Sequence, residues 1–355
     1  MKWWHNLKKN PLARSGVIIL MIFYLTAVFA EFIAPYSPYQ SQIDGSLLPP
    51  TRIYWRNPQG EFIGPHVYPT TQGPVDINTG ERLLQQDQTK PSPLVLFAKG
   101  EPYKLWGLIP GDRHLFGTKG PGKINILGTD EQARDQFSRI VHGSRISLSV
   151  GIFGIAIVFP LGMLMGGISG YFGGWLDVFI MRIAEVLMTI PGIYLLVALA
   201  AILPPGLSST QRFLLIVMIT SFISWAGLAR VIRGQVLSIK EMEFVQATRA
   251  IGGNPLYIII RHVLPQTATY VIISATLAIP SFIVSESVLS LIGLGIQQPD
   301  ASWGNLLSSA TNASILILNP WLVWPPAILL ILTVLAFNLL GDGLRDALDP
   351  RSIRR

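Results

Sequence analysis

Residues 117–123 have the spacing of a phosphate-binding loop. Their sequence, Gly-Thr-Lys-Gly-Pro-Gly-Lys, places glycine and lysine where such a loop holds the phosphates of a nucleotide. The next residue is Ile124, although a Ser or Thr hydroxyl is needed there for Mg²⁺, and Pro121 removes a backbone N–H donor. No apolar strand is predicted before this stretch and no helix after it. We therefore expect no nucleotide site and no ATPase activity in this chain.

Residue types for other common chemistry are scarce. The sequence has no cysteine, which excludes disulfides, thiolate metal sites and cysteine nucleophiles. It shows no cluster of metal ligands and no nucleophile beside a base, so we expect no catalytic residue, no metal and no cofactor. The 27 Lys and Arg residues exceed the 20 Asp and Glu residues, but they fall in short clusters between apolar runs. A nucleic-acid-binding protein would gather them in one patch, so no nucleic-acid partner is expected.

Glu286 is the acidic residue that lies deepest in an apolar run, between Ser285 and Ser287. Ionisable side chains are costly to bury in a bilayer, which makes this glutamate a functional candidate. Two interpretations remain open: Glu286 and Ser287 line a wet transport pathway, or Glu286 hydrogen-bonds within a helix bundle. Arg182 and Glu185, three residues apart, are predicted to pair on one helix face near a membrane boundary.

The elements that position these residues are predicted to be membrane helices. Half of the residues are apolar and 13% are charged, against about a quarter charged in a soluble domain. Apolar stretches of about 18 or more residues indicate transmembrane helices. Six are predicted, at residues 15–34, 146–170, 180–203, 212–232, 267–292 and 321–341. The predicted fold class is an all-α integral membrane protein with six transmembrane helices and a large insert between the first two.

The first apolar stretch has an alternative interpretation as a cleaved signal peptide. Lys2, Lys8, Lys9 and Arg14 precede it, and Val28-Phe29-Ala30 imitates a cleavage site. Removal of the stretch would leave five membrane helices and place the mature N-terminus outside.

Lys and Arg near the helix ends predict which side faces the cytoplasm, where these residues are enriched. Most of them lie on one side if both termini are cytoplasmic. Arg134, Arg139 and Arg145 lie on the opposite side and go against this rule, which long translocated segments obey poorly. The predicted parts are a cytoplasmic N-terminal segment, a first transmembrane helix, an extracytoplasmic insert, a five-helix core and a cytoplasmic basic tail, at 1–14, 15–34, 35–140, 141–345 and 346–355.

Two further patterns predict local structure. The insert is rich in Pro, Gly, Gln and Thr and carries enough aromatic residues for a small ordered cap of loops and short strands. In the second membrane helix, Gly162, Gly166 and Gly170 recur every four residues on one face. Such a stripe lets the backbone of another helix approach closely, so a packing seam is predicted there.

Residues 233–266 form the longest predicted cytoplasmic connection, and they have the signals of a helix–turn–helix elbow. A helix-forming run over Lys240–Ile251 stops at Gly252-Gly253, and Asn254-Pro255 begins a second short helix. The residues Ala247, Thr248, Ala250 and Gly252 are small, so a partner backbone can come close to the tip.

The elbow resembles the coupling loop of binding-protein-dependent ABC importers, in which Glu-Ala-Ala, three residues, Gly and a later Leu-Pro recur. The residues of this chain that match the motif or lie next to a matching residue are Glu243, Gln246, Ala247, Thr248, Arg249, Gly252, Leu264 and Pro265. Gln246 replaces the acid of this motif, Thr248 its second alanine and His262 its isoleucine, whereas the glycine and Leu-Pro that shape the elbow remain.

Two other stretches resemble the peptide and nickel branch of the same importers. The motif before the second membrane helix, called here the pre-span motif, includes Gly128, Thr129, Asp130, Arg134, Asp135, Ser138, Arg139, Gly143 and Arg145. It has Ala133 where the branch usually has glycine. Residues 286–295 and 302–304 resemble the end of the fifth membrane helix in this branch. Residues 10–13 resemble the start of its first membrane helix.

The resemblance implies a permease subunit of the second-permease (C-type) kind, in the cytoplasmic (inner) membrane of a bacterium. It implies a heterodimer with a second permease subunit, two ATPase subunits on the elbows, and an extracytoplasmic solute-binding protein that delivers peptides or similar small solutes. Membrane lipid is the remaining partner. A secondary transporter or channel is the alternative function, and a membrane-embedded enzyme is a more distant one.

Overall fold

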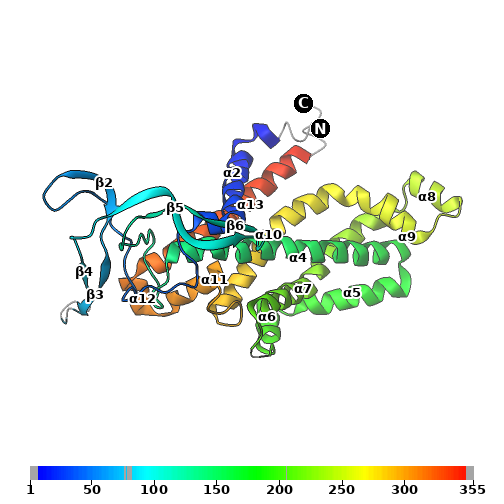
Figure 1. Cartoon of the computed structure of the whole chain (residues 1–355). Coiled ribbons are helices and arrows are strands. Elements are labelled where there is room, and N and C mark those ends of the chain that lie inside the picture. The colour runs from blue at the N-terminus through cyan, green and yellow to red at the C-terminus, as the bar shows by residue number, and fades with distance from the viewer. Residues whose placement is uncertain (1–6, 76, 78–81, 205, 349–355) are drawn as a thin grey trace. The chain divides into compact units, whose positions relative to one another are not determined.

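The computed structural model describes residues 7–75, 77, 82–204 and 206–348. Within these residues, five helical segments are long and apolar enough to cross a membrane, and a bent helix pair adds a sixth if it forms one span. The five are α2 (Pro11–Val28), α4 (Gln136–Phe172), α7 (Ser209–Ile239), Pro255–Leu291, which ends in α10 (Ala268–Leu291), and Pro320–Leu348, which contains α13 (Trp324–Leu348). Five of the six predicted membrane helices are therefore confirmed, and they follow one another in the predicted order (Figure 1).

The third predicted span, at residues 180–203, is wrong as one straight helix. The structure has α5 (Gly174–Thr189) and α6 (Gly192–Ala201), which meet at an angle of 86°. Ile190 between them is extended, with φ −81° and ψ 126°. Pro191 is the cause, because a proline disfavours the helical conformation of the residue before it.

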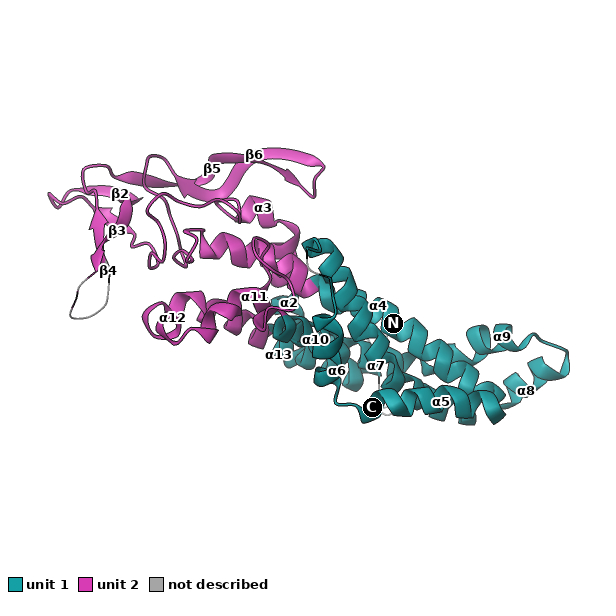
Figure 2. Cartoon of the chain, turned by 90° about the horizontal axis from the view of Figure 1, so that it is seen from below, with its two compact units in different colours: residues 1–20, 149–289, 333–355 teal, residues 21–148, 290–332 magenta. Residues whose placement is uncertain are grey.

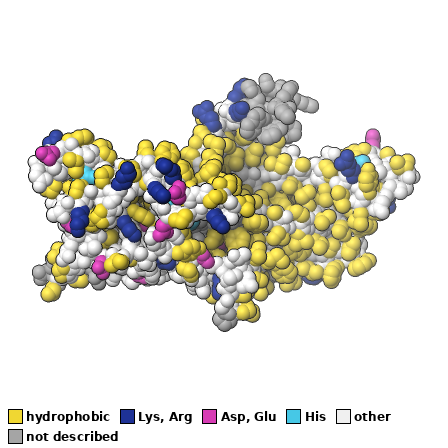
Figure 3. Space-filling view, viewed as in Figure 1, with side chains coloured by type: hydrophobic (Ala, Val, Ile, Leu, Met, Phe, Trp, Pro, Cys, Tyr) yellow, Lys and Arg dark blue, Asp and Glu magenta, His cyan; other side chains and the backbone are white. Residues whose placement is uncertain are grey.

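The chain forms two compact units (Figure 2). Unit 1 contains residues 1–20, 149–289 and 333–355, and unit 2 contains residues 21–148 and 290–332. In Figure 3 hydrophobic side chains cover the visible helices of unit 1, whereas Lys, Arg, Asp and Glu are interspersed over the strands of unit 2. The predicted tail at 346–355 lies largely outside the described residues, as do the first six residues of the predicted N-terminal segment.

The predicted glycine seam of α4 is confirmed inside unit 1. A Cβ on Gly162 would lie 2.8 Å from Leu228 Cδ2, and one on Gly170 would lie 2.8 Å from the carbonyl oxygen of Arg233. A Cβ on Gly166 would overlap the carbonyl oxygen of Ala229. These contacts are all on α7, so the absence of side chains allows α4 and α7 to pack backbone to backbone.

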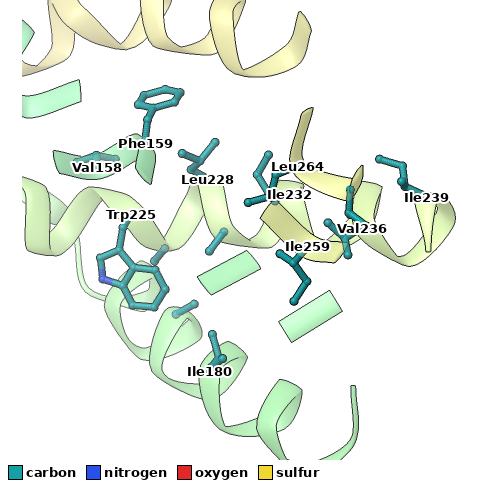
Figure 4. Close-up of a cluster of buried hydrophobic side chains, with 14 of the residues drawn as sticks. Val158, Phe159, Ile180, Trp225, Leu228, Ile232, Val236, Ile239, Ile259 and Leu264 are labelled. Atoms are coloured by element: carbon teal, nitrogen blue, oxygen red, sulfur yellow. The ribbon is translucent and has the colours of Figure 1, made fainter. Parts of the chain in front are cut away.

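The core of unit 1 surrounds this seam. Figure 4 shows Ile232 of α7 beside Ile259 and Leu264, which precede α10; each of the three is at most 6% exposed. An ion pair adds to the apolar contacts, because Arg233 of α7 donates from Nε and a terminal nitrogen to the two carboxylate oxygens of Asp177 in α5, at 2.6 Å each. No local sequence pattern predicts this pair, because its members are 56 residues apart.

The insert in unit 2 is rich in strands. Antiparallel strands β1 (Tyr54–Arg56), β2 (Phe62–Val67), β5 (Ser92–Leu105) and β6 (Ile109–Thr118) form a sheet in the order β1-β2-β5-β6, and β3 (Thr70–Val75) pairs with β4 (Arg82–Gln86). The predicted ordered structure of loops and strands is confirmed, and the all-α fold class is corrected to this extent. The short helices of unit 2 are α3 (Ala30–Ile33), α11 (Trp303–Leu306) and α12 (Ala313–Leu318).

Residues 117–123 begin within the last two residues of strand β6 and continue past its end, and the sequence did not predict this strand. The next helix begins only at Gln136, so the strand–loop–helix context of a phosphate-binding loop is not formed. The N–H of Gly122 donates to Ser92 Oγ at 2.8 Å and is therefore already used within the insert.

The seam leads to a testable expectation. Gly166→Val should lower the free energy of unfolding of the isolated subunit by about 1–3 kcal/mol, because the new side chain overlaps the backbone of α7. Gly227→Val on α7 is the matched control, since a Cβ there meets no atom within 4 Å. Thermal unfolding in detergent measures both variants, and equal midpoints would show that close packing at the seam is unimportant.

Candidate functional site

The elbow is a helix–turn–helix with a different start from the one predicted. Helix α7 continues to Ile239, a turn covers residues 240–242, and α8 spans Glu243–Ala250. The predicted helix from Lys240 is thus interrupted, because Met242 before α8 is extended, with ψ 146°. After the tip, α9 (Pro255–Ile258) leads through a π turn (Ile259–Val263) and a 3-10 turn (Leu264–Thr267) into α10 without a loop.

The tip of the elbow has the geometry that its residues predict. Gly252 has φ +82°, a left-handed conformation that favours glycine. The N–H of Gly252 donates to the carbonyl of Arg249 and the N–H of Gly253 to that of Thr248, both at 3.0 Å, which closes the end of α8. Asn254 then caps α9 by accepting from the N–H of Leu256 at 2.9 Å. The predicted stop and restart are confirmed.

The elbow has a packed side and an exposed side. Val245, Ile258 and Leu264 are buried in the core of unit 1. The exposed residues of the proposed coupling set are Glu243, Ala247, Arg249, Gly252 and Pro265. A hollow of about 320 Å³ is lined by Arg249, by other residues of the elbow and by residues at the end of α4. The exposed side is therefore available to another chain, while the packed side fixes its position.

Gln246 has a structural role that an acid could not take over. Its side-chain amide donates to the carbonyl of Lys240 at 2.9 Å and to the carboxylate of Glu241 at 3.3 Å. A glutamate at this position has no N–H to donate and would face a like charge. The glutamine that replaces the acid of the motif therefore fits the hydrogen-bond acceptors around it.

In the pre-span motif, one carboxylate holds two buried arginines. Asp130 Oδ2 lies 2.7 Å from a terminal nitrogen of Arg134 and 3.3 Å from Nε of Arg139. Arg139 is fully buried and also donates to the carbonyls of Pro38 and Pro299, each at 3.2 Å, and to Gln298 Oε1 at 2.8 Å. The guanidinium therefore joins the start of the insert, the motif and the loop after α10.

The other motif residues are also structural. Asp135 caps α4, because its Oδ2 accepts from the N–H of Ser138 at 2.7 Å. Burial is the main reason why the pKa of Asp135 is raised to about 7; the charge of Asp130 also raises the pKa, and the hydrogen bonds from Ser138 oppose the shift. Gly128 is left-handed, with φ +69°, and a Cβ on Gly143 would lie 3.3 Å from the Cα of Ser302. Thr129 Oγ1 accepts from the N–H of Leu48 at 2.7 Å, and Ser138 Oγ accepts from that of Tyr36 at 3.3 Å.

Arg145 is paired with Glu31, at the end of the segment that follows α2. Both terminal nitrogens of Arg145 contact the two carboxylate oxygens of Glu31, and Nε donates to the carbonyl of Ala27 at 2.6 Å. With Arg134 and Arg139 on Asp130, the three arginines that contradict the charge rule each have a carboxylate partner. The sequence showed Glu31 after an apolar run but not its partner 114 residues away.

Glu286 and Ser287 are buried in α10, with 0% and 6% exposed. Burial favours the interpretation that Glu286 interacts within the helix bundle over the one in which it lines a wet pathway. Arg182 and Glu185 pair as predicted, at 3.1 Å on an exposed face of α5, and Arg230 of α7 lies 3.8 Å from the same glutamate.

These features define an integral membrane subunit in which an exposed elbow continues directly into a membrane helix. Residues 159–354 match the family described as binding-protein-dependent transport system inner membrane component, and residues 2–50 match the N-terminal TM domain of oligopeptide transport permease C. The chain belongs to this family of ABC importer permeases. It is a membrane-spanning transport subunit of the inner membrane, and the ATPase activity of such importers lies in separate subunits.

Named relatives agree with this assignment. The dipeptide transport system permease protein DppC of Bacillus subtilis is 33% identical over 348 residues, which cover 98% of this chain and 84% of that protein. The oligopeptide transport system permease protein OppC of Haemophilus influenzae is 42% identical and covers 64% of this chain and 70% of that protein. The glutathione transport system permease protein GsiD of Pectobacterium atrosepticum is 39% identical, and the match covers 66% of this chain and 75% of that protein.

Among solved structures, a chain of the inward-facing MetNI methionine ABC transporter covers 59% of this chain and 97% of its own length, with 21% identity and a TM-score of 0.45.

The ion pairs of the pre-span motif lead to a contrast between two aspartates. Asp130→Asn should lower the free energy of unfolding by about 3–5 kcal/mol, because it leaves two buried guanidinium groups without a carboxylate. Asp135→Asn keeps an oxygen that can accept from Ser138 and should cost far less. Chemical unfolding of the purified subunit near pH 7.5 measures both, and equal losses would contradict the role of Asp130.

The raised pKa of Asp135 predicts a pH-dependent effect of Asp135→Asn. The pKa of Asp135 is about 7 in the folded chain and about 3.9 in an unfolded one, so protonation of Asp135 stabilises the fold. This contribution is complete below about pH 4 and is lost as the pH rises to about 7. The stability difference between Asp135→Asn and the unaltered chain should therefore change between pH 5.5 and pH 8, with the variant gaining relative stability at pH 8. A constant difference would contradict the raised pKa.

Proposed function

We propose that this chain forms, with a second permease subunit, the pathway of an importer for peptides or similar small solutes. Two separate ATPase subunits supply the energy, and an extracytoplasmic binding protein delivers the solute. The names of the relatives, which are dipeptide, oligopeptide and glutathione permeases, support the choice of peptides. Selectivity in this arrangement resides largely in the binding protein.

The elbow is proposed to be the site where an ATPase subunit docks. The observation that carries this role is its two-sided construction: Val245 and Leu264 are buried in the core, while Ala247 and Gly252 leave an unobstructed exposed tip. Because α9, the π turn, the 3-10 turn and α10 follow one another without a loop, a displacement of the tip is transmitted into a membrane helix. Arg249 and Glu243 supply charges at the rim of the docking surface.

The elbow, both termini and the basic tail are proposed to be cytoplasmic, and the insert at 35–140 extracytoplasmic. The paired arginines support this orientation, since a cation neutralised by Asp130 or Glu31 carries less weight in the charge rule. In this orientation the pre-span motif precedes the core at 141–345 on the extracytoplasmic side. Glu286 and Ser287 are proposed to contribute to the bundle that surrounds the pathway.

Substitution of Gly252 tests the docking role. Gly252→Val should abolish most uptake and reduce retention of the ATPase subunits on purification, because valine adopts φ +82° at a cost of about 1–3 kcal/mol and also adds bulk at the tip. The variant should still insert, since each membrane helix satisfies its own backbone. Arg249→Ala should have a small effect, because an exposed charge contributes no more than about 1 kcal/mol.

Gly252→Asn separates conformation from bulk, because asparagine tolerates the left-handed region. Loss of the ATPases in both Gly252 variants assigns the effect to bulk at a docking surface, and loss in valine alone assigns it to the shape of the elbow. Uptake and ATPase retention are compared at equal membrane abundance. Full transport by Gly252→Val would falsify the docking role.

Reporter fusions test the orientation. A reporter inserted near Asp87, in the insert, should be active only outside the cytoplasm, whereas reporters in the turn at 251–254 or after Arg355 should be active only inside. The reason is that an odd number of membrane helices separates the insert from each of the other two sites, so the insert lies on the opposite side of the membrane. Cytoplasmic activity of the Asp87 fusion would overturn the proposed topology.

A further inference from the structure

The hairpin of β5 and β6 ends in an apolar tip, Leu105-Trp106-Gly107-Leu108-Ile109. The side chains of Trp106, Leu108 and Ile109 are 52%, 79% and 55% exposed. No charged residue lies within the tip, although strands β5 and β6 carry several. A water-facing turn would normally be polar, so this tip requires an explanation.

The tip is tied to the end of the first membrane helix. The indole N–H of Trp106 donates to the carbonyl of Val28, the last residue of α2, at 2.9 Å, and its ring centroid lies 6.5 Å from that of Phe29. Helix α2 is one of the helices that cross the membrane. The tip therefore lies beside the end of α2.

The turn is built at a conformational cost. Trp106 has φ +53°, in the left-handed region where a hairpin turn ordinarily has Asn, Asp or Gly. A bulky residue in this region is an outlier that persists only where the surroundings hold it. Tryptophan has an apolar body and one N–H, the combination that is enriched where a membrane meets water.

The apolar surface of the tip continues onto α2. Met21, Ile22 and Leu25 are 53%, 52% and 49% exposed, and they are followed by the exposed Phe29 beside Trp106. Lys104, which precedes the tip, is also exposed, and its long side chain can reach lipid phosphates while the tip contacts acyl chains. This order of apolar tip and flanking cation matches the layers of a lipid leaflet.

We propose that residues 105–109 lie in the boundary between headgroups and acyl chains, in the leaflet that the end of α2 reaches. The hairpin is thus a membrane anchor of the insert, in addition to its covalent connections. Lipid is the occupant that fits, because it also surrounds the exposed face of the neighbouring helix. The proposal depends on α2 being a membrane helix and not on the transported solute.

A single fluorescent label tests this placement. Because the chain has no cysteine, Leu108→Cys provides one labelling position on an exposed side chain. The subunit is labelled with an environment-sensitive dye, assembled with its partner chains and placed in lipid nanodiscs. Nitroxides attached to lipid near the headgroup should quench the label strongly, and iodide in the water should quench it weakly.

Two other positions calibrate the result. Phe62→Cys on β2 of the same sheet, where the side chain is 70% exposed, should respond to iodide and not to lipid nitroxide. Leu25→Cys on α2 should respond to lipid nitroxide. A label at 108 that behaves like the one at 62 would place the tip in water. A label at 108 that neither quencher reaches would place it under a partner protein, and either result overturns the proposal.

Discussion

The arrangement of unit 2 depends on the carboxylate of Asp130. Two guanidinium groups are buried next to it, and each would be strongly destabilising without an anion nearby. Arg139 uses its remaining N–H groups to bind backbone carbonyls at Pro38 and Pro299, which are far apart in sequence. The start of the insert and the loop after α10 are therefore fixed by one side chain, and that side chain is fixed by Asp130. This need to hold loops together explains the buried charged residues of the pre-span motif.

Unit 1 depends on a different constraint, the absence of side chains on one face of α4. Because Gly166 allows the backbone of α7 to come close, Ile232 and its neighbours can pack tightly against the segment before α10. The elbow is attached to the same core through Val245. A rigid core beneath the elbow and an unbroken helical path into α10 are what a mechanical connection requires. A large side chain at the tip would keep a partner chain away from the elbow, and the rigid core and the helical path could then transmit no motion.

The parts of the structure that the sequence predicted are those fixed by local preferences. Long apolar runs fixed the membrane helices, and Gly252 with Asn254 and Pro255 fixed the turn of the elbow. The 86° bend was missed because Pro191 lies inside the apolar run at 180–203, which was interpreted as one continuous helix. The pairs Glu31–Arg145 and Asp177–Arg233 were missed because no local pattern links residues so far apart. The long hairpin was missed because Trp106-Gly107 is an unusual turn.

The bend between α5 and α6 has a consequence for the chain as a whole. The last carbonyls of α5 and the first N–H groups of α6 lack partners within their helices, and hydrocarbon offers none. Interrupted helices at membrane depth persist only where protein or water covers them. Ile190 at the bend is 40% exposed on this chain. Wherever the bend lies in the hydrocarbon, the backbone groups on either side of it must therefore be covered by a second protein chain or by water.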